Sequence, residues 1–271
     1  MSDFDFDPAA RTRVMFINPL GISVYDQPIA DLLGRIKRPE TEVEVVSLST
    51  APATSHVEYR TYEALVVADT VKVVREAGQS GYDGAVIGCF YDPALEDARE
   101  ISGDMVVTAP CQAACQILAN LCNRFSILVG RHKWIEQMQE RVDRYGYGRY
   151  LASFRTLDMG VDDFQKDTRF TEERILETAR RAVEEDHAEG IILGCTAEFG
   201  FFQEVQNELG VPVIDAVFAS FKMAEHLAGL KNQLGWKPSR QWSCQPPPED
   251  EIAKFGLFAE PAPIGNRVRA G

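Results

Sequence analysis

The sequence lacks the features by which membrane, secreted and nucleic-acid-binding proteins are recognised. It contains no apolar run of about 18 residues, so no transmembrane helix is expected. Its acidic beginning, MSDFDFD, has neither the basic nor the apolar segment of a secretory signal. The net charge of −13 argues against nucleic acid or an anionic membrane surface as a partner, because both attract Lys and Arg. We therefore expect a cytoplasmic protein that acts on a small molecule.

Histidine is also scarce, and no residue pattern indicates a metal or cofactor site. Four scattered histidines form no metal-ligand or Ser-His-Asp pattern and are predicted to be structural: His56, His132, His187 and His226. The only glycine-rich hint, at 146–148, follows a predicted helix rather than a strand, which does not favour a phosphate loop. The six cysteines are expected to be reduced in the cytoplasm, as catalytic or buried thiols.

One motif occurs twice in the chain. The copies are GAVIGCFYDP at 84–93 and EGIILGCTAE at 189–198. Each is a short apolar strand that ends at a Gly-Cys pair, with a carboxylate three residues after the cysteine: Asp92 after Cys89, and Glu198 after Cys195. The copies lie about a hundred residues apart, too far for a solenoid repeat and suitable for two similar α/β lobes.

Short apolar strands and helices alternate along the rest of the chain. Further strands are predicted at 13–17, 43–48, 105–107, 125–129, 151–156 and 212–214. Helices are predicted at 25–38, 58–77, 109–121, 133–145, 171–185, 199–209 and 218–233, with Thr171 as a cap. This order predicts the α/β class, with two pseudo-symmetric lobes, each a mainly parallel sheet flanked by helices, and an active-site cleft between them.

The first lobe is assigned to 12–110 and 215–235, the second to 111–214, and 236–271 is a Pro-rich C-terminal tail. Six tail residues are too apolar for a solvated linker: Trp236, Trp242, Ile252, Phe255, Leu257 and Phe258. We therefore expect part of the tail to pack on the body or on a partner subunit of a homo-oligomer.

Two thiols that face one cleft can invert a carbon centre. Ligands bind beyond the carboxyl ends of parallel strands, where Cys89 and Cys195 both lie. One thiolate removes an acidic C–H proton while the opposing thiol returns a proton to the other face, and no cofactor is needed. The reference cysteine pKa of about 8.5 falls readily at helix N-termini, where both cysteines are expected. Asp92 and Glu198 are predicted either to stabilise those helix N-termini or to orient another group.

Several candidate residues have a structural alternative. A single buried cysteine is more often a packing residue, but the matched flanks favour a catalytic pair. Cys111, Cys115 and Cys122 share one helical face and are interpreted as small core residues, because nothing completes a metal site. Asn18 is either a ligand contact or a turn residue. Asp215 is either a supporting site residue or the N-cap of the helix that follows it.

These residues resemble the aspartate/glutamate/hydantoin racemase superfamily, most closely its hydantoin racemase branch. The pieces that carry the likeness are FINP at 16–19, IGCFYDPAL at 87–95, LGC at 193–195 and PVIDAV at 212–217, within a similar region of 13–234. The resemblance implies two pseudo-symmetric lobes around a cleft, no cofactor, and proton transfer by Cys89 and Cys195. It also implies that Asn18 contacts the substrate.

The likeness has departures that keep other functions open. Leu20 to Ser23 replace the Asn and Thr that usually follow in the hydantoin branch, and Thr196 to Glu198 replace its small residues. Phe90 and Tyr91 suit a neutral cyclic imide better than an amino acid, and with Thr196 they are predicted to contact the substrate. The alternatives are an amino-acid racemase, a cis–trans isomerase or decarboxylase of a small dicarboxylate, and a binding protein without turnover.

Overall fold

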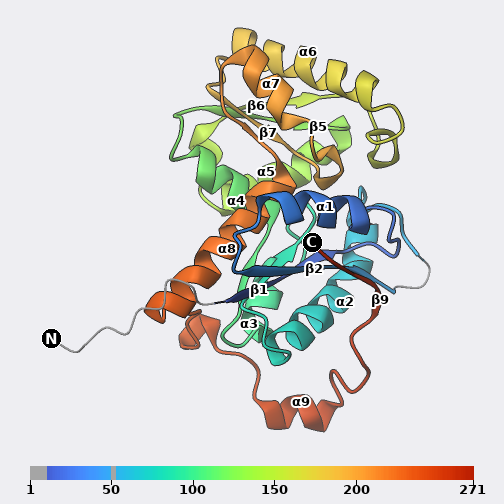
Figure 1. Cartoon of the computed structure of the whole chain (residues 1–271), viewed down its shortest axis with the longest axis vertical. Helices are drawn as coiled ribbons and strands as arrows, with labels where there is room; N and C mark the ends of the chain where they lie inside the picture. The colour runs from blue at the N-terminus through green and yellow to red at the C-terminus, as the bar shows by residue number, and fades with distance from the viewer. Residues whose placement is uncertain (1–10, 50–52) are drawn as a thin grey trace, which may run out of the picture.

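Two separate sheets organise the chain, and the computed structural model describes residues 11–49 and 53–271 (Figure 1). The first sheet has the strand order β4-β3-β1-β2-β9 and the second the order β6-β5-β7-β8. Every neighbouring pair is parallel except β2 with β9. The predicted α/β class with mainly parallel sheets is thereby confirmed. We call each sheet with its covering helices the first or the second lobe.

The first lobe is a sheet covered by helices on both faces. Its strands are β1 (Thr12–Asn18), β2 (Thr41–Leu48), β3 (Gly84–Ile87), β4 (Val106–Thr108) and β9 (Ile264–Arg269), and its helices are α1 (Asp26–Ile36), α2 (Arg60–Gln79), α3 (Leu95–Ile101) and α8 (Ala216–Leu234). Alternate side chains of β1 point to opposite faces. Val14 and Phe16 pack with α1 and α8, whereas Met15 and Ile17 pack with α2 and α3. A strand that is buried on both faces has a sequence of consecutive apolar residues, as β1 does.

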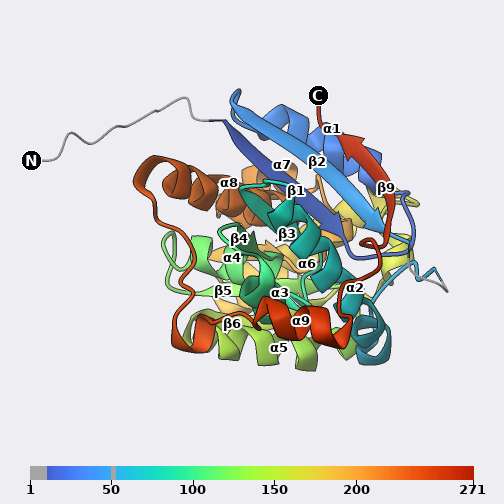
Figure 2. The same cartoon turned by 90° about the horizontal axis from the view of Figure 1, so that it is seen from below.

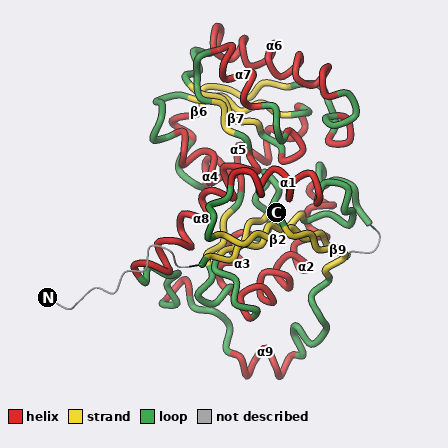
Figure 3. Tube along the Cα trace, viewed as in Figure 1, coloured by secondary structure: helices red, strands yellow, loops and turns green. Residues whose placement is uncertain are grey.

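The second lobe has the same layering. Its strands are β5 (Phe125–Val129), β6 (Leu151–Thr156), β7 (Gly190–Leu193) and β8 (Val213–Ile214), and its helices are α4 (Pro110–Leu118), α5 (Ile135–Arg144), α6 (Thr168–Asp186) and α7 (Phe202–Leu209). Figure 3 shows the strands between α6 and α7 on one side and α4 and α5 on the other. Cys111 and Cys115 are buried in this core as predicted. Cys122 lies beyond the end of α4, so it does not share their helical face.

The predicted start of the longest helix in the second lobe is wrong. α6 begins at Thr168, and the Asp167 side chain caps it by accepting a hydrogen bond from the Phe170 amide. Thr171, the predicted cap, lies inside the first turn. Its hydroxyl donates to the carbonyl oxygens of Phe164 and Asp167. An i−4 hydrogen bond of this kind is the alternative that a Thr hydroxyl has within a helix.

The C-terminal tail returns to the first lobe and adds a strand to it (Figure 2). β9 pairs antiparallel with β2, with Val268 opposite Val45. A short helix, α9 (Glu249–Phe255), lies earlier in the tail, where Ile252 is buried. Four of the apolar tail residues remain exposed: Trp236, Trp242, Phe255 and Leu257. The expectation that part of the tail packs on the body is confirmed. The tail is held mainly by the pairing of β9, a strand with several polar residues, and not by most of the apolar residues that suggested the packing. Within the described ranges, none of the helices combines the length and apolar character that a membrane span needs.

Candidate active site

Each catalytic candidate follows a glycine that the local packing requires. The Gly88 amide donates to the Ile17 carbonyl oxygen at 2.7 Å, and the Gly194 amide donates to that of Leu128 at 2.8 Å. A Cβ on Gly88 would lie 2.4 Å from the Phe16 ring, and one on Gly194 would lie 2.4 Å from the Leu128 carbonyl oxygen. Only glycine lets each strand end approach its neighbour this closely. The Gly-Cys pair of the motif therefore places a cysteine just beyond the carboxyl end of the strand.

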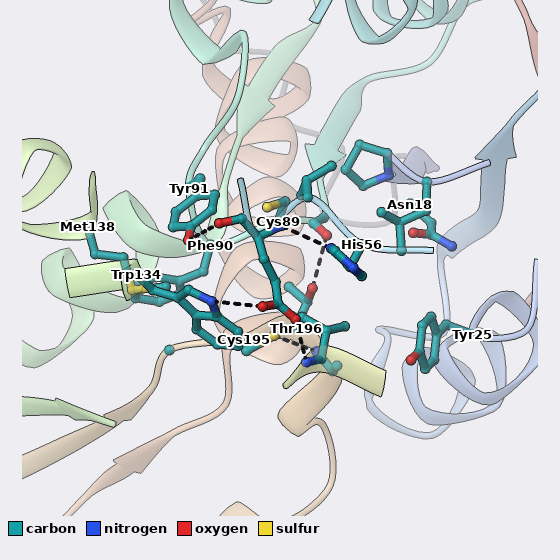
Figure 4. A pocket seen from close by; sticks show the side chains of 18 of the residues that line it. Asn18, Tyr25, His56, Cys89, Phe90, Tyr91, Trp134, Met138, Cys195 and Thr196 are labelled. Carbon is teal, nitrogen blue, oxygen red and sulfur yellow. Dashed lines mark hydrogen bonds between the residues drawn. The ribbon is translucent and has the colours of Figure 1, made fainter. Parts of the chain in front are cut away.

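The two cysteines line one cavity between the lobes (Figure 4). Cys89 reaches it from the end of β3 and Cys195 from the end of β7, and both side chains are partly exposed there. The cavity measures about 60 Å³. The sequence-based expectation that both thiols meet at one cleft agrees with this placement.

Neither thiol lies at the N-terminus of an α-helix, contrary to expectation. Cys89 is separated from α3 by a turn, and Cys195 precedes only a 3-10 turn, η4 (Thr196–Glu198). Each sulfur instead faces the backbone N–H two residues ahead: Tyr91 for Cys89, and Ala197 for Cys195 at 3.4 Å. Burial outweighs these hydrogen bonds and raises the pKa of both thiols.

The carboxylates that follow the cysteines have different roles. Asp92 caps α4 rather than the helix that follows it in sequence, because its carboxylate accepts hydrogen bonds from the Cys111 and Gln112 amides. Asp215 is the N-cap of α8, the structural alternative for this residue, and accepts from the amides of Val217 and Phe218. Burial raises the pKa of Asp92 to about 7 and that of Asp215 to about 6. Glu198 is fully buried and caps no helix.

The predicted substrate contacts all line the cavity, but two have their polar hydrogens engaged. The Asn18 amide nitrogen donates to the Ile22 carbonyl oxygen and to Asp26 Oδ1, so only Asn18 Oδ1 is left for a ligand. The Thr196 hydroxyl donates across the cleft to the Gly88 carbonyl oxygen at 3.1 Å. That hydrogen bond joins the two lobes beside the cysteines. Phe90 and Tyr91 supply apolar wall.

The loop between β2 and α2 lines the cavity, a role that was not predicted for it. Glu58, between β2 and α2, reaches the second lobe, where it accepts hydrogen bonds from Arg131, Trp134 and the Val161 amide. Its own carbonyl oxygen accepts from the Tyr91 hydroxyl at 3.3 Å. Glu58 was predicted to begin the helix at 58–77, but α2 begins at Arg60 and leaves Glu58 in the loop. No periodicity marks a single Glu as a residue that joins two lobes.

Three further side chains of the wall come from segments far apart in the chain. His56 was predicted to be structural, but it lines the cavity, and its Nδ1 accepts from the Glu58 amide at 3.4 Å. Trp134 and Met138 line the cavity from η1 (His132–Trp134) and α5. Among the described residues that form the wall there is no Lys or Arg. The cavity is thus mainly apolar, with two thiols, an imidazole and a Glu already engaged by the second lobe.

Comparison with known proteins shows which family has this sequence. The family described as Asp/Glu/Hydantoin racemase matches residues 14–224. The chain belongs to this family. It is therefore an isomerase of the racemase type. It is 32% identical to a hydantoin racemase of Pseudomonas sp. (strain NS671) over 218 residues, which covers 80% of this chain and 86% of that protein. It is 34% identical to one of Rhizobium meliloti over 217 residues, covering 80% and 89%.

Solved structures of a racemase and of a decarboxylase have the same fold. Allantoin racemase from Klebsiella pneumoniae superposes with a TM-score of 0.80 at 28% identity, covering 88% of this chain and 94% of that one. Arylmalonate decarboxylase has a TM-score of 0.56 at 17% identity, covering 80% and 92%, and at that identity shares the fold alone. The racemase match ends at residue 224, before the segment that contains α9 and β9.

Proposed function

We propose that this racemase inverts the carbon next to a carbonyl group in a hydantoin-like cyclic amide, with Cys89 and Cys195 as the two bases. The single observation that carries the proposal is that the two thiols, from pseudo-symmetric strand ends, line one cavity. Hydantoin and allantoin racemases are among the proteins that the chain resembles, which supports the substrate class.

The reaction requires no change in oxidation state and no cofactor. The thiolate of one cysteine takes the proton from the carbon, and the electron pair of the broken C–H bond moves into the adjacent carbonyl as an enolate. The other cysteine, as a thiol, then donates its proton to the opposite face of that carbon. The product leaves with inverted configuration and the two cysteines have exchanged protonation states. The cycle is complete when a proton has moved back from the first cysteine to the second, so that each has its original protonation state.

The charges around the cavity favour a neutral ring over an amino acid. An α-carboxylate held in an apolar cavity needs a cation or several N–H donors, because burying an unpaired charge is very costly. The described wall offers no Lys or Arg, and the amide nitrogen of Asn18 is engaged elsewhere. The same argument weighs against a dicarboxylate as the substrate of an isomerase or decarboxylase. A hydantoin ring places no full charge in the cavity.

The proposal is tested with enantiopure hydantoins that differ in their side chain. 5-Benzylhydantoin, allantoin, glutamate and aspartate are each incubated with the protein in D₂O. Loss of optical rotation and deuterium uptake at the stereocentre are then measured against the enzyme-free rate. We expect both signals with a hydantoin and neither with the amino acids. Absence of both signals across the hydantoins would remove the assignment, and thermal stabilisation by a hydantoin without exchange would indicate a binding protein.

A further inference from the structure

The amide group of Asn18 is held in one orientation at the cavity. Its nitrogen donates to the Ile22 carbonyl oxygen at 3.2 Å and to Asp26 Oδ1 at 2.9 Å. A main-chain carbonyl oxygen can only accept a hydrogen bond, so the amide nitrogen, and not the amide oxygen, must face Ile22. Asn18 lines the cavity, whereas neither of the residues that hold its nitrogen does. The remaining polar atom of the side chain, Asn18 Oδ1, is therefore the one that can meet a ligand.

Asp26 is the stronger of the two acceptors. It is fully buried in the first turn of α1, where the positive end of the helix dipole stabilises a carboxylate. Hydrogen bonds to a carboxylate are shorter and roughly twice as strong as those between neutral groups. A buried carboxylate also needs donors of its own, because an unpaired buried charge is very costly. Asn18 supplies a donor to only one of the two Asp26 oxygens.

The C-terminal strand supplies the donor for the other oxygen. The side-chain nitrogen of Asn266 in β9 donates to Asp26 Oδ2 at 2.9 Å. Asn266 lies opposite Ser47 of β2, and Ser47 lies opposite Asn18 of β1. Residues opposite one another in a sheet share a face, so the two amides stand in one row, and Asp26 bridges them across the strand between. The racemase match ends at residue 224, before β9.

An acceptor at this point in the cavity selects a ligand that brings a hydrogen-bond donor. A carbonyl or enolate oxygen of the substrate would be repelled by Asn18 Oδ1, whereas an N–H group donates to it. N–H and carbonyl groups alternate around a hydantoin ring, so the group that meets Asn18 fixes how the ring lies. Figure 4 shows Asn18 on one side of the two cysteines and Trp134 and Met138 on the other.

We infer that Asp26 and Asn266 are positioning residues that turn the oxygen of Asn18 toward the cavity, where it accepts a hydrogen bond from a ring N–H group of the substrate. The inference rests on the proposed function and goes beyond it, because it states which group of the ring is recognised. It also gives the C-terminal strand a part in substrate selection. A substrate with a methyl group in place of that hydrogen is rejected.

N-methylation of the substrate tests the inference. Racemic 5-benzylhydantoin and its N1-methyl and N3-methyl derivatives are titrated into the full-length protein, and each dissociation constant is measured by calorimetry. We expect one methylated compound to bind about tenfold more weakly than the parent or worse, because Asn18 Oδ1 loses its donor. We call this ratio of dissociation constants the methyl discrimination. Binding is measured because N-methylation also changes the acidity of the reacting C–H.

Variants separate the hydrogen bond from a simple lack of space. Asn18→Ala removes the acceptor and should reduce the methyl discrimination to about twofold or less. Asp26→Ala lets the Asn18 amide turn and should lower the discrimination about threefold or more. Asp26→Asn keeps an oxygen for the Asn18 nitrogen and should restore it, since Asn266 can turn its own oxygen to the new amide. Asn266→Ala should lower it about twofold or more. Asp31→Ala, which removes an exposed carboxylate of α1 that accepts from Gln27, should change nothing.

The inference is overturned if both methylated compounds bind as tightly as the parent. It is also overturned if Asn18→Ala keeps the wild-type discrimination, because the cavity wall and not the hydrogen bond would then exclude the methyl group. The positioning role is refuted if Asp26→Ala and Asn266→Ala both keep that discrimination. Asn266 is partly exposed, so Asn266→Ala decides this point if thermal unfolding shows that Asp26→Ala does not fold.

Optical rotation of enantiopure 5-benzylhydantoin distinguishes these failures from a failure of the proposed function. Racemisation of the parent compound without methyl discrimination would overturn the inference and leave the proposed function intact. A protein that neither binds nor racemises the parent compound would remove the proposed function, and the inference with it.

Discussion

The surroundings of Cys89 and Cys195 are alike in backbone and unlike in side chains. Both thiols follow a glycine whose N–H binds the neighbouring strand, and both face an N–H two residues ahead. Around this shared frame, one loop carries Phe90 and Tyr91 and the other carries Thr196 and a buried Glu. The shared backbone geometry comes from the repeated Gly-Cys motif, which places two thiols at one cavity. The differing side chains show that the shape of the cavity wall is set outside the frame.

The largest effect is expected when one of the two thiols is removed. Cys89→Ser and Cys195→Ser should each lower the rate of inversion by about two to four orders of magnitude, because a serine hydroxyl is far too weak an acid to replace the thiol. Each variant keeps one thiol, so it should still exchange the substrate proton with solvent from one face. Deuterium uptake measured on each enantiomer separately should give opposite preferences for the two variants. Wild-type racemisation by both would contradict the two-base mechanism.

The two glycines of the frame should differ in how badly they tolerate a methyl group. A Cβ on Gly194 would lie 2.4 Å from a backbone carbonyl oxygen, whereas the closest clash of one on Gly88 would be with the end of a side chain, the Phe16 ring, and its contact with the Ile17 carbonyl oxygen would be longer, at 2.9 Å. We expect both Ala variants to lose about 1–3 kcal/mol of unfolding free energy, with Gly194→Ala the worse. Urea unfolding measures this. Gly229→Ala in α8 is the control, since its Cβ would lie 3.4 Å from the nearest atom, an Arg38 Nη1, and helix propensity should make it slightly stabilising.

The buried Glu198 should make the stability of the protein depend on pH. Its pKa is raised above 4.5 in the fold, so the folded state keeps a proton that the unfolded chain loses as the pH rises. Stability falls with pH wherever the folded state binds more protons. Relative to wild type, Glu198→Gln should therefore gain up to ~1.4 kcal/mol per pH unit above about pH 4.5. Unfolding at pH 5, 6 and 7 measures this, and a constant difference between the two proteins would refute it.

The smallest effect concerns the strand that only the first lobe receives from the tail. Asn266 of β9 donates to Asp26 Oδ2 at 2.9 Å, and Asp26 Oδ1 holds the Asn18 amide. Asn266→Ala should cost about 1–2 kcal/mol, because Asp26 is buried and loses a donor. Thermal unfolding measures the loss, with the exposed Arg269→Ala as control. Equal melting temperatures for both variants would mean that β9 does not support Asn18.

Much of the fold could be predicted because the central strands are buried on both faces. Residues such as Phe16, Ile87 and Leu193 lie in continuous apolar runs, which locate β1, β3 and β7 and hence the residues at their carboxyl ends. The repeated Gly-Cys pair then indicated the site. The start of α6 was missed because Asp167 and Thr171 both precede plausible first turns, and local pattern does not decide between them.

What could not be predicted depends on contacts between distant segments. β9 carries Asn266, Arg267 and Arg269 and has no apolar run, so only its pairing with β2 makes it a strand. Glu58 acquires its role from donors in the other lobe. The pKa of both thiols was expected to be lowered by helix starts, yet burial dominates in the folded chain. Sequence pattern reports local structure, and these features are set by tertiary packing.

The pairing of β2 with β9 also bears on how the protein is made. The strands of the second lobe come from one continuous stretch, whereas the first sheet draws on both β2 at 41–48 and β9 at 264–269. At a synthesis rate of about 5–20 residues per second, β9 follows β2 by on the order of ten seconds or more. Until then the edge of β2 stays open, and an open edge is a template for pairing with another chain. β9 therefore acts as a late cover that closes a site of aggregation in the nascent protein.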